Sequence, residues 1–261
     1  MSELSDRVVV VTGAGHGIGA SIAEAFATSG ARVALFDLDG PAAQSVAERI
    51  DAVALPLAVD VTDEEAVQRA MGQVVETFGG LDVLVNNAAI TASRQPTWFG
   101  GPALDLPVAQ WRRVLDVNLT GAFICAQQAA RQMRDRGGQI VNIASVQGIR
   151  PTRGSIDYAT SKAGMIMLTH CLAGELAAHQ IRVNAVAPGP IALDPAAEPG
   201  SSGTLTGRWG TPRDVADAVL YLASPGAHYV NGHVLVVDDG TSIAPREAPA
   251  RRDVPLVRAE G

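Results

Sequence analysis

The sequence predicts an α/β protein built on a single parallel sheet, and two observations support this fold class. Short apolar runs rich in Val, Ile and Ala alternate with longer stretches that have helical periodicity. Most of these runs are apolar throughout rather than alternating, which is typical of strands buried on both faces. This order favours right-handed βαβ crossovers and a doubly wound sheet.

The expected elements follow in chain order. The strands are predicted at about 7–12, 32–36, 53–56, 83–86, 138–143, 182–187 and 233–238. The helices are predicted at about 17–29, 41–50, 63–78, 107–135, 157–179 and 212–223. Asp63 is a candidate N-cap, and Pro212 suits the first position of the last helix. We therefore expect a single seven-stranded parallel sheet flanked by helices.

No repeat or linker divides the 261 residues. We expect one domain over residues 1–240 and a tail over 241–261. Two loops, 91–106 and 188–210, break the alternation. Both follow the carboxyl ends of predicted strands, where open α/β sheets bind ligands. We expect these loops to form the substrate site.

Composition excludes several classes of function. The net charge of −7 and the pI near 5.2 argue against a nucleic-acid or anionic-membrane surface. The two cysteines and five histidines show no metal-ligand spacing. The sequence shows no export signal and no apolar run long enough to cross a bilayer. We expect a cytoplasmic protein that holds no metal and acts on a small molecule.

A glycine-rich loop follows the first predicted strand and reads Thr-Gly-Ala-Gly-His-Gly-Ile-Gly over residues 12–19. Its glycines allow a tight turn and a close approach of the backbone to a pyrophosphate, which the next helix N-terminus attracts. The stretch also matches G-x-G-x-x-A over 15–20, so the motif alone does not fix the register. The order strand, loop, helix predicts the dinucleotide site of a Rossmann fold.

Asp37 indicates whether that dinucleotide is NAD or NADP. It ends the second predicted strand, about 20 residues after the loop, where an acid binds ribose hydroxyls. A carboxylate there repels a 2′-phosphate, and the following Leu38 and Asp39 supply no cation. The sequence therefore predicts NAD rather than NADP.

Tyr158 and Lys162 lie four residues apart on a predicted helix, with Ser145 upstream. Both side chains leave one helix face. A nearby cation favours the phenolate and lowers a tyrosine pKa from about 10. Tyr–Lys pairs are common on solvated helices, so this pair gains its weight from the distant glycine loop.

Over about residues 5–240, these motifs together resemble the short-chain dehydrogenase/reductase family. The stretch Asn86-Asn87-Ala88-Ala89 is similar to the family's Asn-Asn-Ala-Gly, and Ser145, Tyr158 and Lys162 match its catalytic set, with Asn118 as the helix asparagine. The resemblance assigns these residues to the cofactor: Gly13, Gly15, His16, Gly17, Ile18, Gly19, Asp37, Leu38, Asp60, Val61, Asn87, Ala88, Ala89, Tyr158, Lys162, Pro188, Gly189 and Ile191.

The resemblance implies hydride transfer between a carbinol carbon and the nicotinamide. Tyr158 would exchange the hydroxyl proton, and Ser145 would hydrogen-bond the substrate oxygen. Lys162 would hold the cofactor ribose and lower the pKa of Tyr158, and Asn118 would hold a water that links Lys162 to solvent. The family also implies a homo-oligomer, either a dimer or a tetramer.

Three positions depart from the family pattern. Ala89 replaces a glycine, Leu193 stands where Thr is frequent, and Asp239 stands where glycine is common. The 188–208 segment looks shorter than the usual substrate lid. The 91–106 loop looks longer than usual and offers alternative cover.

The substrate is left open by the sequence. Ser145, Gln147 and Trp98 are candidate substrate residues, and Arg150 or Arg153 also hint at a hydroxylated substrate. We expect a sugar, a polyol or an alicyclic alcohol.

Two alternatives stay open. One is a 3-oxoacyl-thioester reductase, although such enzymes usually look adapted to NADP, with a basic residue where His16 or Leu38 stands here. The other is a dinucleotide-sensing regulator, against which the intact Ser–Tyr–Lys set with Asn118 argues.

Overall fold

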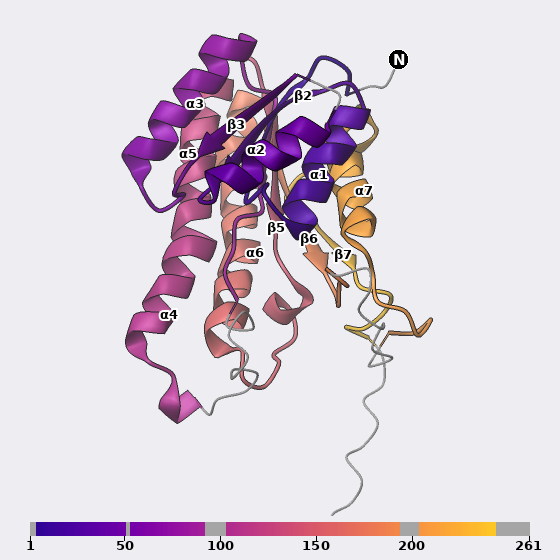
Figure 1. Ribbon diagram of the computed structural model, residues 1–261. Helices are drawn as coiled ribbons and strands as arrows, with labels where there is room; N and C mark the ends of the chain where they lie inside the picture. Colours follow the sequence, from indigo (N-terminus) through magenta and orange to yellow (C-terminus); the bar gives the residue numbers. More distant parts are fainter. Residues whose placement is uncertain (1–3, 51–52, 92–102, 194–203, 244–261) are drawn as a thin grey trace, which may run out of the picture.

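The computed structural model describes residues 4–50, 53–91, 103–193 and 204–243 (Figure 1). Its centre is a seven-stranded parallel sheet in the order β3-β2-β1-β4-β5-β6-β7. The strands are β1 (Val8–Thr12), β2 (Arg32–Asp37), β3 (Ala54–Ala58), β4 (Val83–Asn86), β5 (Gly138–Ile143), β6 (Ile181–Pro188) and β7 (Val234–Val237). The order reverses between β1 and β4, which pair in parallel. The predicted fold class is confirmed.

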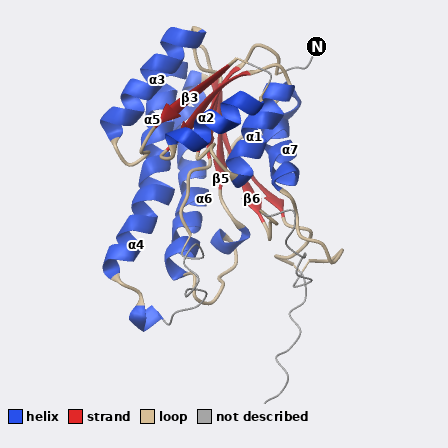
Figure 2. Ribbon diagram, viewed as in Figure 1, coloured by secondary structure: helices blue, strands red, loops and turns tan. Residues whose placement is uncertain are grey.

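Helices cover both faces of the sheet (Figure 2). One face is covered by α1 (Gly17–Thr28), α2 (Gly40–Arg49) and α7 (Pro212–Ala223), whose apolar residues share one core cluster. The other is covered by α3 (Glu64–Phe78), α5 (Gly121–Met133) and α6 (Ile156–Leu176). Helix α4 (Val108–Leu115) continues beyond the carboxyl edge of the sheet (Figure 1).

The central strand β1 shows why the sheet needs both layers. Its five residues are all buried, with Val9 and Val11 in one core cluster and Val8 and Val10 in the other. Burying each valine side chain is worth about 1.5–3 kcal/mol. The continuous apolar run seen in the sequence therefore reflects two cores, one on each side of the sheet.

Local capping agrees with the sequence. The Asp63 carboxylate accepts the N–H of Ala66 at 3.0 Å and starts α3. Thr211 and Asp214 form a reciprocal capping box at the start of α7, with Pro212 at the first helical position. These bonds satisfy N–H groups that the helix itself leaves unpaired.

The predicted helix 107–135 is not continuous. Helix α4 ends at Leu115, a π-helical segment covers Asp116–Thr120, and α5 begins at Gly121. Asn118 lies inside the π-helical segment and is fully buried. A π-helical turn inserts an extra residue into a helix, often at functional sites. Local periodicity did not reveal it.

The described structure continues past residue 240, the expected end of the domain, to residue 243. Thr241 and Ser242 form an ordered turn, because their carbonyls accept hydrogen bonds from Arg150 at 3.2 and 2.9 Å. The Ser242 N–H also reaches the Asp238 carboxylate at 2.6 Å. The rest of the expected tail lies outside the described residues.

Candidate active site

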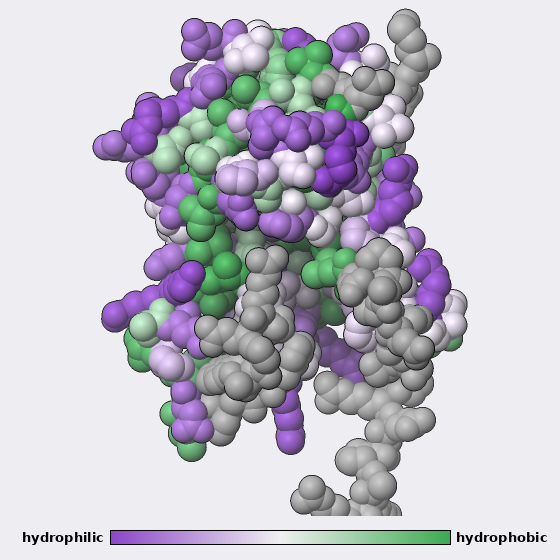
Figure 3. All heavy atoms as spheres, in the orientation of Figure 1, coloured by the Kyte–Doolittle hydropathy of each residue, from purple (hydrophilic) through white to green (hydrophobic). Residues whose placement is uncertain are grey.

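A cleft of about 1470 Å³ runs along the carboxyl edge of the sheet. It is lined by the ends of β1 to β6, by α4 and by the start of α6. In the space-filling view, apolar surface gathers around the hollow in the middle of this face, and the surface above is mostly hydrophilic (Figure 3). The cleft spans the point where the strand order reverses, the usual ligand site of open α/β sheets.

The glycine loop forms the floor of the cleft. Gly13 and Gly17 adopt positive φ values of 63° and 53°, which side chains rarely tolerate. A Cβ added at Gly15 would lie 2.9 Å from the Asp37 carboxylate. His16 provides no side-chain cap to α1, so the first-turn N–H groups stay available to a ligand. This cradle fits the diphosphate of a dinucleotide.

Asp37 is fixed by two backbone N–H groups. Its carboxylate accepts from Gly15 at 2.8 Å and from Asp39 at 2.9 Å. Each carboxylate oxygen keeps a free lone pair, so the group can still accept hydrogen bonds from ribose hydroxyls. The next residue, Leu38, is exposed and lines the cleft without adding a cation.

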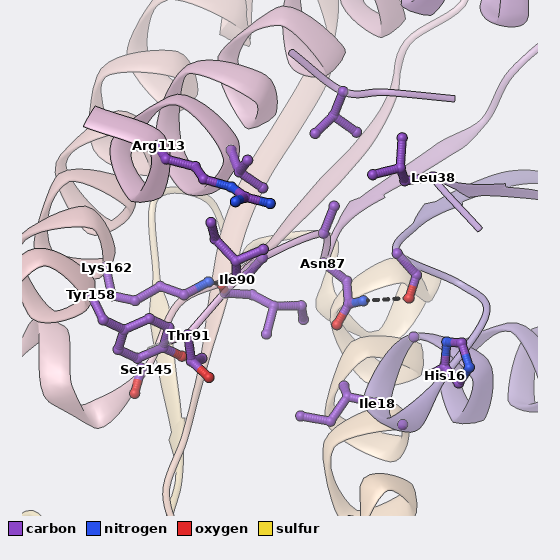
Figure 4. Close-up of a pocket in the computed structure, with 18 of the residues that line it drawn as sticks. His16, Ile18, Leu38, Asn87, Ile90, Thr91, Arg113, Ser145, Tyr158 and Lys162 are labelled. Carbon is purple, nitrogen blue, oxygen red and sulfur yellow. Dashed lines mark hydrogen bonds between the residues drawn. The ribbon is translucent and has the colours of Figure 1, made fainter. Parts of the chain in front are cut away.

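The end of β4 is clamped to the glycine loop. The Thr12 hydroxyl accepts the N–H groups of Asn87 and Ala88, both at 3.0 Å. The Asn87 side chain donates to the carbonyls of Thr12 and Gly13 at 2.9 and 3.0 Å (Figure 4). Asn87 thus shapes the cofactor loop as well as lining the cleft. The sequence did not single out Thr12, whose only signal was its place before the first glycine.

Ala89 lines the cleft without strain. Among the described residues, the non-glycine positions with positive φ are Asp6, Gln180 and Asp239, and Ala89 is not one of them. The backbone here therefore does not demand the family's glycine. Of the other assigned cofactor residues, Asp60, Val61, Pro188, Gly189 and Ile191 also line the cleft.

Ser145, Tyr158 and Lys162 meet at one end of the cleft (Figure 4). Ser145 follows β5, whereas Tyr158 and Lys162 project from the first turns of α6. The Lys162 ammonium lies 5.6 Å from the centre of the Tyr158 ring. It donates a hydrogen bond of 2.6 Å to the Ile143 carbonyl, and its side chain is 2% exposed.

The electrostatics of the pair differ from the expectation. Burial raises the pKa of Tyr158, and a hydrogen bond with Ser145 only partly opposes this. Burial also lowers the pKa of Lys162 to about 8. The expected fall in the Tyr158 pKa is therefore not seen, because desolvation of the phenolate outweighs the hydrogen bond with Ser145.

Asn118 connects two elements of the site. Its amide oxygen accepts the N–H of Ile90 at 2.8 Å, and its nitrogen donates to the Ile90 carbonyl at 3.0 Å and to the Ser161 hydroxyl at 3.1 Å. The residue thereby holds the segment after β4 against α6, beside Lys162.

On the substrate side, Gln147 lines the cleft beside Ser145. Its side-chain oxygen is buried and has no hydrogen-bond partner among the described residues. Leu193 also lines the cleft, and a Cβ on Gly17 would lie 3.4 Å from its side chain. Trp98, most of the 91–106 loop and residues 194–203 of the 188–210 loop lie outside the described residues.

Arg150 does not serve the role expected of it. Its guanidinium donates to the carbonyls of Thr241 and Ser242, and neither Arg150 nor Arg153 lines the cleft. The contacts come from a segment 91 residues away in the chain, which the sequence pattern did not connect to Arg150.

One wall of the cleft comes from a helix the sequence did not implicate. Ala109, Arg112, Arg113 and Asp116 all line the cleft from α4 and the residue after it. Their spacing of i, i+3, i+4 and i+7 places them on one helix face. This spacing is present in the sequence and could have identified these lining residues.

The described part of the chain offers neither a cluster of metal ligands nor a membrane-spanning helix. No group of three or more His, Cys, Asp or Glu side chains there is placed to hold a metal ion. None of the helices in these residues has the length and apolar character needed to cross a membrane.

Comparisons with known proteins identify the family. A family model described as enoyl-(acyl carrier protein) reductase matches residues 13–242. The 3-oxoacyl-[acyl-carrier-protein] reductase FabG of Aquifex aeolicus is 38% identical over 91% of this chain and 98% of that protein. The cis-4-hydroxycyclohexanecarboxylate dehydrogenase of Sinomonas cyclohexanicum is 40% identical over 90% of this chain and 96% of that protein.

A further relative and a solved structure agree. Galactitol 2-dehydrogenase (L-tagatose-forming) of Cereibacter sphaeroides is 39% identical over 92% of this chain and 96% of that protein. A crystal structure of a short-chain type dehydrogenase/reductase from Mycobacterium marinum has a TM-score of 0.84 and 38% identity, over 92% of this chain and 97% of that one. The protein is thus a member of the short-chain dehydrogenase/reductase family, oxidoreductases that interconvert alcohols and ketones with a nicotinamide dinucleotide.

Proposed function

We propose that this protein is an NAD-dependent dehydrogenase that interconverts a secondary alcohol and a ketone, with Tyr158 as its general acid and base. The observation that carries the proposal is the shared cleft. Ser145, Tyr158 and Lys162 face the same space as the glycine loop and Asp37. A proton donor and a dinucleotide cradle are therefore within reach of one substrate.

The residues divide the chemistry. A bound nicotinamide supplies or accepts the hydride. Tyr158 gives its phenolic proton to the forming alkoxide during reduction and takes the hydroxyl proton during oxidation. Ser145 donates a hydrogen bond to the same oxygen. A raised pKa keeps Tyr158 protonated in the free protein, ready to act as the acid.

Lys162 and Asn118 support Tyr158 without contacting the substrate themselves. The Lys162 ammonium holds ribose hydroxyls and, when charged, favours the phenolate during oxidation. Asn118 holds the water that would connect Lys162 to solvent. Its observed bonds to Ile90 and Ser161 support a position beside that path.

The preference for NAD rests on Asp37. Its carboxylate is fixed at the end of β2 by Gly15 and Asp39, where a 2′-phosphate would meet a negative charge. Leu38 offers no compensating cation.

For the substrate we propose a hydroxylated compound, either a polyol or an alicyclic alcohol. Gln147, which lines the cleft and whose buried side-chain oxygen has no partner among the described residues, supports this, because a turn of its side chain would let a second substrate hydroxyl satisfy that oxygen. Two relatives are named for such substrates, a hydroxycyclohexanecarboxylate and galactitol. Trp98 is a further proposed substrate residue. The similarity to FabG keeps a 3-oxoacyl-thioester reductase as the second candidate.

We also propose a cytoplasmic homo-oligomer, a dimer or tetramer, formed by one catalytic domain per chain. Exposed apolar side chains on two neighbouring helices, Phe123 on α5 and Met167 on α6, support a helix-to-helix interface.

A substrate screen tests the function. Purified protein is assayed with NAD and with NADP against polyols, sugars, alicyclic and aryl alcohols, and in reverse with a 3-oxoacyl thioester. NADH formation from a polyol or alicyclic alcohol is expected, with NAD used better than NADP. Faster thioester reduction with NADPH would favour the second candidate. NADH binding without any turnover would favour a sensor.

A further inference from the structure

We propose that Arg113 closes the outer side of the adenosine pocket, with its guanidinium stacked on the adenine base. This inference rests on the proposed function, because it needs a dinucleotide in the cleft. No motif of the sequence pointed to Arg113. The argument comes from the orientation of α4, from the charges in the cleft and from the chemistry of the guanidinium.

The orientation of α4 follows from contacts on two of its faces. Gln110 on α4 donates to the buried Asp157 carboxylate of α6 at 3.0 Å. Asn118, further along, donates to Ser161, also on α6. The face that carries Gln110 and Asn118 therefore points toward α6 and the end of the cleft that holds Tyr158.

A second face points toward the nucleotide end. Gly121 packs so closely on Val61 that an added Cβ would lie 2.7 Å from the valine side chain. Val117 and Arg113 are four residues apart on one helix face, and both line the cleft together with Val61. Since Val61 follows β3, the neighbour of β2, Arg113 lies on the side of the cleft that the ends of these two strands form.

Figure 4 agrees with this placement. Arg113 reaches from its helix into the cleft above Ile90, toward the side where Leu38 lies. Val61, Val117 and Leu38 line this part of the cleft with apolar surface. A flat base placed there would meet apolar side chains below and the guanidinium above.

Arg113 is available for a ligand. It is exposed and makes no hydrogen bond or ion pair within the described part of the chain. Lys162, the cation at the other end of the cleft, is already bonded to Ile143. A planar guanidinium stacks well on aromatic rings and is better suited to this than an ammonium.

The test compares ligands that carry different parts of the cofactor. Dissociation constants are measured by calorimetry for NADH, ADP-ribose, adenosine and nicotinamide mononucleotide. In Arg113→Ala, NADH, ADP-ribose and adenosine are expected to bind about fivefold more weakly, and nicotinamide mononucleotide is expected to bind unchanged. Arg113→Lys should recover only part of the loss.

A matched control removes one positive charge elsewhere. Arg69 on α3 is exposed and pairs only with Glu65, outside the cleft. Arg69→Ala should leave all four dissociation constants within twofold, which separates stacking from the general effect of lost positive charge on the binding of anionic ligands.

The outcomes separate this inference from the proposed function. If the unmodified protein binds neither NADH nor ADP-ribose, the proposed function fails. If it binds both and Arg113→Ala binds adenosine and ADP-ribose equally well, only the role of Arg113 is overturned. A loss for ADP-ribose but not for adenosine would also overturn it, because the guanidinium would then contact phosphate rather than the base.

Discussion

The nucleotide side and the substrate side of the cleft are built in different ways. On the nucleotide side, short polar contacts fix the ends of strands that are already paired, as with Asp37 on Gly15 and Asn87 on Gly13. Around the substrate side, long-range contacts outside the cleft lining join loops, as with Arg150 on Ser242. The first side inherits its shape from the sheet. The second side is an assembly of loops that can change without disturbing the sheet.

The substrate side depends on the turn at residues 238–242. Asp238 accepts the N–H groups of Gly240 and Ser242, at 2.9 and 2.6 Å. Asp239, at a φ of 48°, accepts both the N–H and the hydroxyl of Thr206. The aspartate that replaces a common glycine therefore joins the end of the short lid segment to the turn.

The largest expected effect lies where the two sides meet, at Tyr158. Tyr158→Phe removes the proton donor and keeps the ring, so kcat should fall by about 10³-fold. The dissociation constant of NADH, measured by fluorescence, should stay within twofold, because the nucleotide side is intact. Turnover within tenfold of the unmodified protein would remove Tyr158 from the mechanism.

Substitution of Lys162 tests how much the burial of its charge, beside Tyr158, destabilises the folded protein. Its pKa falls to about 8 on folding, so the charged form destabilises the folded protein below pH 8. Between about pH 8 and 10.4 the unfolded chain holds more protons, and stability should rise with pH. Lys162→Met removes this dependence.

The difference in unfolding free energy, unmodified protein minus Lys162→Met, should therefore increase by up to about 3 kcal/mol from pH 7 to pH 10. Urea unfolding of the ligand-free proteins measures it. A difference that is constant with pH would show that Lys162 titrates normally.

The smallest expected effects are changes in substrate KM and in NADH affinity, and they distinguish the substrate side of the cleft from its nucleotide side. Arg150→Ala frees the 238–242 turn, so the KM for substrate should rise about fivefold while NADH affinity stays within twofold. Asn87→Ala is the opposite case and should weaken NADH without a selective change in substrate KM. Equal changes in both parameters for both variants would mean that the two sides are not independent.

The sequence predicted the nucleotide side well because its signals are local. The order of strand, glycines and helix, and then Asp37, are determined within about 25 residues of chain. The parallel, doubly wound sheet also followed from the alternation of elements. The partner of each residue is near in sequence or on an adjacent strand.

The substrate side was predicted less well because its contacts are distant. Nothing near Arg150 indicates that it binds carbonyls at residues 241 and 242. The raised pKa of Tyr158 likewise depends on burial, which the Tyr–Lys spacing does not report. The π-helical segment within the 107–135 helix carries Asn118, whose bonds with Ile90 join it to a distant segment, and helical periodicity is the same on both sides of it.

The π-helical segment Asp116–Thr120 sets how far α4 is rotated about the helix axis relative to α5. Each residue of an α-helix turns it by about 100°. If the extra residue between Asp116 and Thr120 were lost, α4 would rotate relative to α5 by about that angle. Gln110 would then no longer meet Asp157, and Arg113 would leave the side of Val61. The cleft of this protein thus depends on a helix that carries one residue more than a regular helix would need.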